Sequence, residues 1–398
     1  MESENINDNV TEQFHKLDIC GWSVFHYLFT RPPIQTGTFL STYLIPWFIT
    51  AFLLYGIPLI IAWVKVPNVL FSDPDAGLTV GFLADWNMMF VFLVTVPMFV
   101  IFMLSERSMV PMRIAGIVSE RAIYRGNNIS DFVSLWNKRY KIVNVFGQSG
   151  GLLVAFLAAF ANYKFLYTME GLTVWGGGGN KVNAAGWVLL FWQAPLFYWL
   201  LSIYLSQELA TIFLLFSITR NFEIKIWPFH HDNCCGLKAV GYIGLRNQYL
   251  LAVGGLNLLA LLAVNLKRGD PRTLTLLVMC FTAYITLGPV IFIGPLLPFR
   301  KSMLLAKQRE QAKVATKLQQ EYTRIMNEID NRLIAKEDEE IIDRLQKLKD
   351  LVNRIPVWPF DISTMRRFLT VYIFPLLTGL VSLLVSYIIT ALKAMYAN

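Results

Sequence analysis

The stretch WVLLFWQAPLFYWLLSIYLSQELATIFLLFSIT, residues 187–219, decides the fold class of this chain. It is much longer than the roughly 20 apolar residues that cross a bilayer along its normal, and it holds one acidic residue, Glu208. A polar segment, IKIWPFHHDNCCGLKAVG (residues 224–241), follows it and contains two of the four histidines and two of the four cysteines. The pair predicts a membrane helix that leads into a polar segment at the bilayer boundary.

Composition points the same way over the whole chain. Its 398 residues are 55% hydrophobic and only 16% charged, which is outside the usual range of soluble proteins. The net charge of +8 is typical of a membrane protein with lysines and arginines in its cytoplasmic loops. We therefore expect the lipid bilayer as a partner, no nucleic acid, and no cofactor.

Seven apolar runs of spanning length predict an all-α, multi-spanning membrane protein. The spans are expected at residues 42–64, 86–104, 150–167, 187–219, 247–266, 273–297 and 368–392. Residues 1–41 are expected to form the N-terminal part, in which Phe14 to Leu28 repeat at helical spacing and predict an amphipathic helix in the interface. Spans one to six then occupy residues 42–299, with loops at 106–148 and 220–246.

Residues 300–367 have a different character from the spans around them. They are rich in charge, and apolar residues recur in them at helical steps, which predicts a helical hairpin or short coiled coil before the last span in residues 368–398. The apolar stripe of such a hairpin needs a partner. Self-association is the simplest source, so a homo-oligomer is expected, and a cytoplasmic protein partner is the alternative.

The distribution of basic residues predicts the orientation. The loops after spans two, four and six carry most of the lysine and arginine, and loops of this kind face the cytoplasm. The N-terminus and the hairpin are then cytoplasmic, and the C-terminus lies outside.

Polar residues within the spans are the candidates for an ion path. Glu208 inside a span would be an ion or proton ligand, because a buried carboxylate is costly unless it is paired, protonated or hydrated. If the helix ends earlier, Glu208 is merely solvated at the boundary. Ser382, Ser386 and Thr390 step by four along one helix face, which suits either a pore lining or a close helix contact. Asn257 could line the same path or bridge two helices.

Part of the polar segment is repeated as a sequence motif later in the chain. Trp-Pro-Phe occurs at 227–229 and again at 358–360, each time followed within three residues by an aspartate that can cap the next helix. The candidate residues of this motif are Trp227, His230, His231, Asp232, Trp358 and Asp361. They predict either a twice-used interfacial elbow or a paired site near the cytoplasmic mouth of a pathway. No metal site is predicted, because adjacent His-His and Cys-Cys pairs turn poorly toward one metal ion.

A resemblance rests on three of these motifs. The pattern H-x-D-x-x-x-G-L at 230–237, the sequence PLLPFR at 295–300 and the sequence WPFD at 358–361 together resemble a family of uncharacterised bacterial membrane proteins. In that family the position of His231 is commonly proline and that of Cys235 commonly glycine. The resemblance implies a bacterial inner-membrane location and carries no known activity.

Three functions fit this sequence. The first is a homo-oligomeric ion channel with the last span lining the pore, because the layout is similar to that of insect odorant-receptor channels. The alternatives are a membrane scaffold or signalling component that acts through its cytoplasmic helices, and a secondary transporter. An enzyme is not expected, because convergent acids, histidines and metal ligands are sparse.

Overall fold

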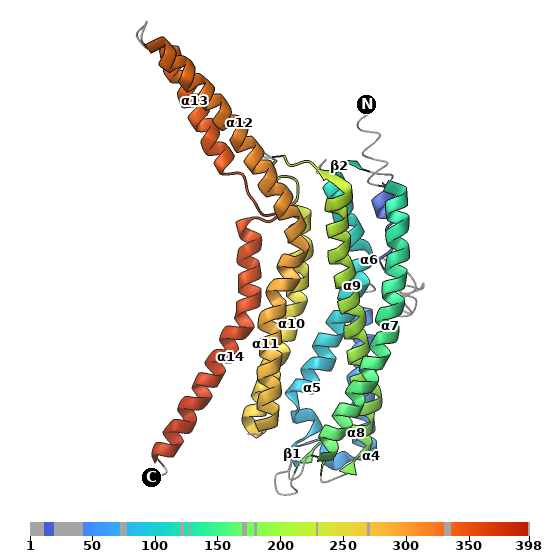
Figure 1. Ribbon diagram of the computed structural model, residues 1–398. Coiled ribbons are helices and arrows are strands. Elements are labelled where there is room, and N and C mark those ends of the chain that lie inside the picture. Colours follow the sequence, from blue (N-terminus) through green and yellow to red (C-terminus); the bar gives the residue numbers. More distant parts are fainter. Residues whose placement is uncertain are drawn as a thin grey trace.

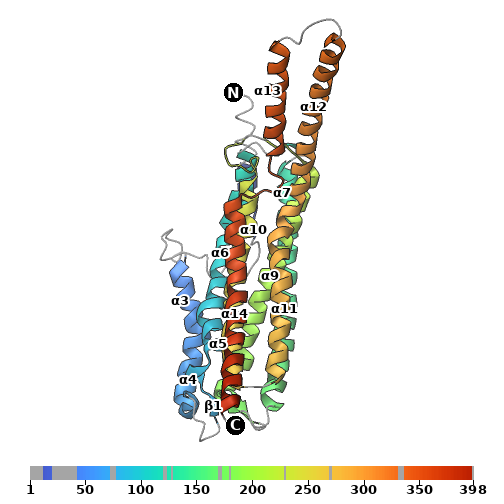
Figure 2. The same cartoon turned by 90° about the vertical axis from the view of Figure 1, so that its left-hand side faces the viewer.

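Long antiparallel helices form a bundle in the computed structural model (Figures 1 and 2). The structure describes residues 12–19, 43–71, 78–119, 123–126, 129–168, 173–178, 181–227, 230–268, 271–329 and 336–396. The last helix finishes at the end of the bundle opposite to a helical hairpin that projects beyond the other helices (Figure 1).

Several of the long helices are continuous runs of shorter segments. The elements in chain order are α3 (Ile45–Ala51), η2 (Phe52–Gly56), α4 (Ile57–Lys65), η3 (Pro67–Val69), η4 (Phe82–Ala84), α5 (Trp86–Phe90), η5 (Val91–Thr95), α6 (Val96–Ser119), α7 (Ile129–Thr168), α8 (Ala184–Val188), η6 (Leu189–Gln193), α9 (Ala194–Asn221), α10 (Lys238–Arg268), α11 (Pro271–Ile293), η7 (Gly294–Leu296), α12 (Leu297–Ile329), α13 (Lys336–Asn353) and α14 (Ile362–Tyr396).

Within the described residues, five helices are long and apolar enough to cross a membrane. They cover Ile45–Lys65, Trp86–Glu106, Ile129–Ala161, Ala184–Asn221 and Leu277–Asn327. The chain is therefore an all-α, multi-span integral membrane protein, as its sequence predicts. The long helices α10 and α14 lie where the sequence places two further spans.

Two small sheets close the ends of the bundle. At one end β1 (Leu78–Val80), β3 (Thr173–Val174), β4 (Gly177–Gly178) and β5 (Lys181–Val182) pair in that order. At the hairpin end β2 (Ile123–Gly126) pairs antiparallel with β6 (Phe222–Ile224). In the first sheet the Trp175 indole is buried and donates to Asp85 Oδ2 at 3.0 Å, which ties the glycine-rich segment to the start of α5.

Three of the spanning helices contain a π-helical turn, and each turn has the same cause. The π turns η2, η5 and η6 end two residues before Pro58, Pro97 and Pro195, respectively. Proline has no N–H to donate and its ring clashes with the preceding turn, so the backbone widens there.

The carbonyls freed in η2 find donors on the neighbouring helix. Trp192 Nε1 donates to Leu53 O at 2.9 Å, and Gln193 Nε2 donates to Leu54 O at 2.6 Å. Because lipid offers no donor of its own, these two side chains hold α3–α4 against η6. Gln193 is thus a bridge between helices.

The structure adds detail to two parts of the sequence prediction. Of the expected interfacial helix, residues 20–28 lie outside the described residues, and Phe14, Leu17 and Ile19 are buried in the bundle. Phe14 packs edge-on against Phe132 and Phe222, so the apolar side of this segment meets protein, and its place in the membrane interface stays a prediction. The predicted loop 106–148 is mostly helical, because α6 continues to Ser119 and α7 begins at Ile129.

We predict that the hydrogen bond from Gln193 to Leu54 O stabilises the protein because Pro58 leaves this carbonyl without a backbone donor. Gln193→Leu should lower the free energy of unfolding by about 1–3 kcal/mol, because it leaves a buried carbonyl without a donor. With Pro58→Ala the backbone regains an N–H, and the same substitution should then cost markedly less. Chemical unfolding of the four proteins of this double-mutant cycle in detergent measures the difference. Equal costs in both backgrounds would disprove the link.

Candidate functional site

A buried polar cluster lies where α6, α9 and α10 meet. Glu106 of α6 is 2% exposed, Glu208 of α9 is 6% exposed, and Asn247 of α10 is 3% exposed. The Asn247 side-chain amide donates to Glu208 Oε2. The structure thus decides between the two interpretations of Glu208: its carboxyl group is inside the bundle and is not solvated at the end of a helix.

Arg246, next to Asn247 in the chain, interacts with the other acid, Glu106. Adjacent helical residues point about 100° apart, so α10 directs Arg246 toward α6 and Asn247 toward α9. One guanidinium nitrogen lies 3.8 Å from Glu106 Oε1. The other donates to Phe102 O at 2.6 Å and to Ser105 Oγ at 2.7 Å. The guanidinium is therefore fixed mainly by neutral acceptors, with the carboxylate at the limit of an ion pair.

The two carboxyl groups also interact with each other. Glu208 is close enough to Glu106 for a direct electrostatic and side-chain interaction. Among the described residues, Glu106 Oε2 has no hydrogen-bond donor although it is buried. Each buried carboxylate disfavours the negative charge of the other. Arg246 in the cluster, and Arg113 and Arg367 in the lining of the adjoining cavity, supply positive charge to the site.

A cavity of about 210 Å³ adjoins the cluster. Glu106, Glu208, Arg246 and Asn247 form part of its wall. Further residues of α6, α9, α10 and α14 complete the lining: Met109, Val110, Arg113, Thr211, Tyr242, Ile243, Leu245, Tyr249 and Arg367. The cavity is large enough for a hydrated ion or a few waters, so the two acids are next to space that a mobile species could enter.

The sequence alone reveals only one of the four residues of this cluster. Glu208 was expected, whereas Glu106 was missed because the second span was predicted to stop at Leu104. The signal that could have found it is the apolar helical spacing of Val110, Ile114 and Ile117, which are all buried and continue the pattern of the span. Arg246 was missed for a similar reason, since it comes directly before the predicted start of span five.

The other predicted ion-path residues are not part of the cluster. Asn257 lies ten positions after Asn247 on α10, about 15 Å along the axis, and its Oδ1 is buried without a donor among the described residues. The positions of Ser382, Ser386 and Thr390 fall on the C-terminal half of α14. The structure thus joins Glu208 to Glu106, Arg246 and Asn247, while the side chains at 382, 386 and 390 lie outside the part that the structure describes.

The polar segment at 230–238 folds around the carboxylate of Asp232. Its oxygens accept from the backbone N–H groups of Cys234, Gly236 and Lys238 at 2.8, 3.1 and 3.2 Å, and His230 Nδ1 lies 2.9 Å away. The turn needs left-handed backbone at Asn233, Cys235 and Gly236, with φ of 55°, 61° and 84°. Burial raises the pKa of Asp232, but the backbone hydrogen bonds outweigh it and the pKa is lowered.

The polar segment lies against the second Trp-Pro-Phe motif, at residues 358–361. Lys238 Nζ is 3.2 Å from Asp361 Oδ2, and a side chain at Gly241 would collide with Pro359 O. Asp361 also caps α14, because its Oδ1 accepts from Thr364 N at 2.8 Å. Burial raises the pKa of Asp361, but the bonds from Thr364, Ser363 and Lys238 outweigh this and lower it. The two motifs together form one structural joint between α10 and α14.

The tryptophans of the two motifs stack with basic side chains. Lys225 Nζ lies 4.3 Å from the centre of the Trp227 ring, and the Arg300 guanidinium lies 4.5 Å from that of Trp358. His231 is exposed and packs against the His230 ring at 4.2 Å. These contacts suit an elbow at the membrane boundary.

The two cysteines of the segment have no reactive features. Cys234 and Cys235 are buried, and burial raises the pKa of both thiols to about 12. A thiol in this state is a poor nucleophile and a poor metal ligand. In the described part of the chain, no group of three or more His, Cys, Asp or Glu side chains is arranged to hold a metal ion.

Comparison of the chain with family models, with characterised proteins and with solved structures found no significant match. The class of the molecule therefore follows from its own fold: it is a multi-span integral membrane protein with a buried acid–arginine cluster.

We predict that Asp232→Asn destabilises the protein at neutral pH and flattens its acid sensitivity. Because the folded-state pKa of Asp232 lies below the unfolded value of about 3.9, its stabilisation is present above pH 4 and is lost as the pH falls toward the folded value. A loss of about 1–2 kcal/mol at pH 7 is expected from hydrogen bonds to a charged acceptor.

Thermal unfolding in detergent between pH 7 and pH 3 tests this prediction. Asp350→Asn, at an exposed position on α13, is the matched control and should leave the curve unchanged. Parallel curves for the wild type and Asp232→Asn would contradict a stabilising carboxylate.

Proposed function

We propose that this protein is an ion channel of the bacterial inner membrane, built from several copies of the chain with α14 lining the pore. The proposal takes α10 and α14 as spans in addition to the five apolar helices, which gives seven. It involves no catalytic step.

The outward face of α14 is the observation that carries the proposal. On its inner face, Tyr372 is stacked against Tyr284 at 5.4 Å and donates to Ile285 O at 2.7 Å. On the other face Thr370, Phe374 and Thr378 are exposed in the single chain. Serine, serine and threonine follow at the same step of four at 382, 386 and 390. Because each step of four advances about 40° around a helix, this second group lies on a different face from Thr370.

A row of hydroxyl residues after an uncovered helix face suits a helix that meets its own copies around an axis. Small polar residues allow helices to approach closely and can face water in a pore. Figure 1 supports this view, because the C-terminal end of α14 stands away from the rest of the bundle.

The arrangement of the ends supports the predicted orientation. β2, β6 and the α12–α13 hairpin lie at one end of the molecule, and α14 ends at the other (Figure 1). The first of these ends contains the three segments richest in lysine and arginine. The positive-inside rule therefore places it in the cytoplasm.

A secondary transporter is the second candidate, and the acid cluster favours it. Glu106 and Glu208 share a buried site beside a cavity, which is the kind of site that could load and release a proton or cation. A scaffold is the third candidate. It is favoured by a groove of about 600 Å³ along the hairpin, whose lining includes Val314, Leu318 and Ile342.

The channel proposal predicts that an acid at position 386 changes conduction. In planar bilayers with purified protein under a KCl gradient, Ser386→Glu should shift the reversal potential toward that of K⁺, because a ring of acids attracts cations. Thr316→Glu makes the same kind of change at an exposed site on the hairpin and should leave the reversal potential unchanged. An unchanged potential with a correctly assembled Ser386→Glu protein would rule out position 386 as pore-lining.

The transporter candidate makes a different prediction. Glu208→Gln keeps the size of the side chain and the bond from Asn247, but it removes the titratable group. Saturable, proton-driven uptake into proteoliposomes should fall by at least tenfold if Glu208 carries the coupled proton. Glu310→Gln on the hairpin is the matched control. Channel currents that persist in Glu208→Gln without any saturable uptake in the wild type would exclude the transporter.

A further inference from the structure

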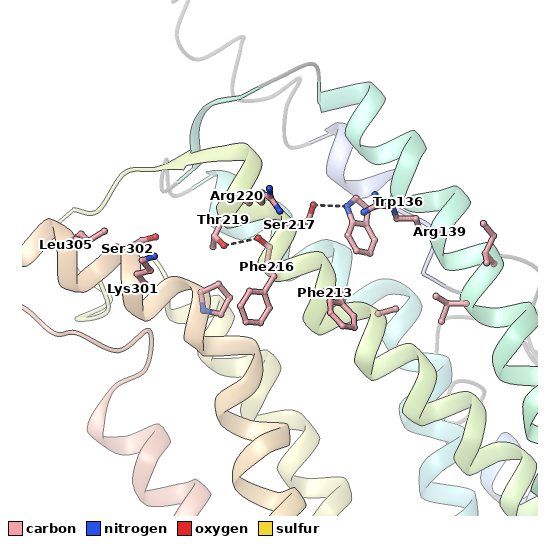
Figure 3. Close-up of a pocket in the computed structure, with 14 residues that line it drawn as sticks. Trp136, Arg139, Phe213, Phe216, Ser217, Thr219, Arg220, Lys301, Ser302 and Leu305 are labelled. Carbon is pink, nitrogen blue, oxygen red and sulfur yellow. Dashed lines mark hydrogen bonds between the residues drawn. The ribbon is translucent and has the colours of Figure 1, made fainter.

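A wide groove opens on the side of the bundle between α7, α9 and α12. It has a volume of about 940 Å³. Figure 3 shows Trp136 and Arg139 on one side, Lys301 and Ser302 on the other, and Ser217 to Arg220 at the end of α9 between them. All three helices belong to the apolar helices that can cross a membrane.

The polar part of the groove is positively charged. Arg139, Arg220 and Lys301 contribute to its lining, which includes no acidic residue. All three side chains are exposed. Arg139 lies 5.0 Å from the centre of the Trp136 ring, and in the described part of the chain none of the three forms an ion pair with a carboxylate. Three uncompensated cations in one groove favour an anionic ligand.

The remaining wall is apolar and faces outward. Phe213 is 62% exposed, and Phe216 and Ile142 are 44% and 55% exposed. Figure 3 places Phe216 below Arg220 and Phe213 further along α9. The exposed apolar surface continues away from the cations through side chains such as Leu209 and Phe146. Exposed apolar surface of this kind on a spanning helix is suited to lipid chains.

Trp136 fixes Arg139 at this groove. Only 4% of Trp136 is exposed, its ring nitrogen donates to Ser217 Oγ at 3.3 Å, and the Arg139 guanidinium lies over its ring. The groove therefore has the polarity profile of one phospholipid, with cations at one end and apolar side chains beyond them.

We infer that this groove binds an anionic phospholipid. Its phosphate lies among Arg139, Arg220 and Lys301, and its acyl chains run along Phe216 and Phe213. The inference does not depend on the proposed channel, since none of these residues belongs to α14 or to the acid cluster.

Native mass spectrometry of the full-length protein in a mild detergent tests the inference. Phosphatidylglycerol and phosphatidylcholine with the same acyl chains are titrated separately. We expect phosphatidylglycerol to bind at least tenfold more tightly. The triple variant Arg139→Gln, Arg220→Gln, Lys301→Gln should bind it about 100-fold more weakly, from roughly fivefold for each cation near a lipid headgroup.

Two further variants separate charge from structure. Arg309→Gln, Lys317→Gln, Arg354→Gln makes the same charge change on exposed parts of the hairpin and its junction, and it should bind like the wild type. Arg139→Lys, Arg220→Lys keeps the charges and should retain most of the affinity. This variant also keeps the test decisive if the triple variant fails to fold.

Three results would overturn the inference. The first is equal affinity for phosphatidylglycerol and phosphatidylcholine. The second is equal loss in the groove and hairpin triple variants. The third is complete competition by millimolar inorganic phosphate, which would show an anion site without a role for the acyl chains.

Discussion

Lipid offers no hydrogen bonds, and this constraint accounts for most of the polar contacts within the bundle. Where proline removes an N–H from a spanning helix, the backbone widens into a π turn. In η2 the freed carbonyls accept from Trp192 and Gln193. The hydroxyl groups of Thr50, Thr211 and Thr282 donate to backbone carbonyls one turn earlier in their own helices. Side-chain hydrogen bonds to backbone carbonyls of a neighbouring helix therefore add to the packing of apolar faces in holding the bundle together.

Polar groups and helix faces that find no partner among the described residues of one chain are therefore informative. Glu106 Oε2 has no donor among the described residues, beside a second carboxyl group and a cavity. On α14, Thr370 and Phe374 are exposed in the single chain. Three cations in the groove of α7, α9 and α12 have no carboxylate partner in the part of the chain that the structure describes. We propose further copies of the chain for the exposed residues of α14 and an anionic lipid for the three cations.

The joint formed by the two Trp-Pro-Phe motifs connects these features mechanically. Asp232 organises the turn before α10, and Lys238 of α10 reaches Asp361 at the start of α14. The helix that bears Arg246 and Asn247 is thus fixed directly to the proposed pore helix. The ion pair and the close contact of Gly241 with Pro359 hold the start of α10 against the start of α14.

The sequence predicted the helical class and the hairpin segment well, because both depend on long periodic patterns that local residues determine. It also placed Glu208 among the important residues. Glu106 and Arg246 escaped prediction because each comes just outside an apolar run, and only packing shows that the helix continues and buries them. Phe14 is a related case: an amphipathic pattern does not say whether its apolar face meets lipid or protein, and in the structure Phe14 packs against Phe132 and Phe222. The neighbouring positions 233, 235 and 236 take left-handed backbone that no pattern of residue types revealed.

The most direct test of the central claim is a recording of the current across a planar bilayer that contains purified wild-type protein. The account predicts discrete, uniform current steps from a preparation that is a monodisperse oligomer in detergent. A silent bilayer from the same oligomer, across the range of voltage, pH and anionic lipid content, would contradict a pore lined by α14.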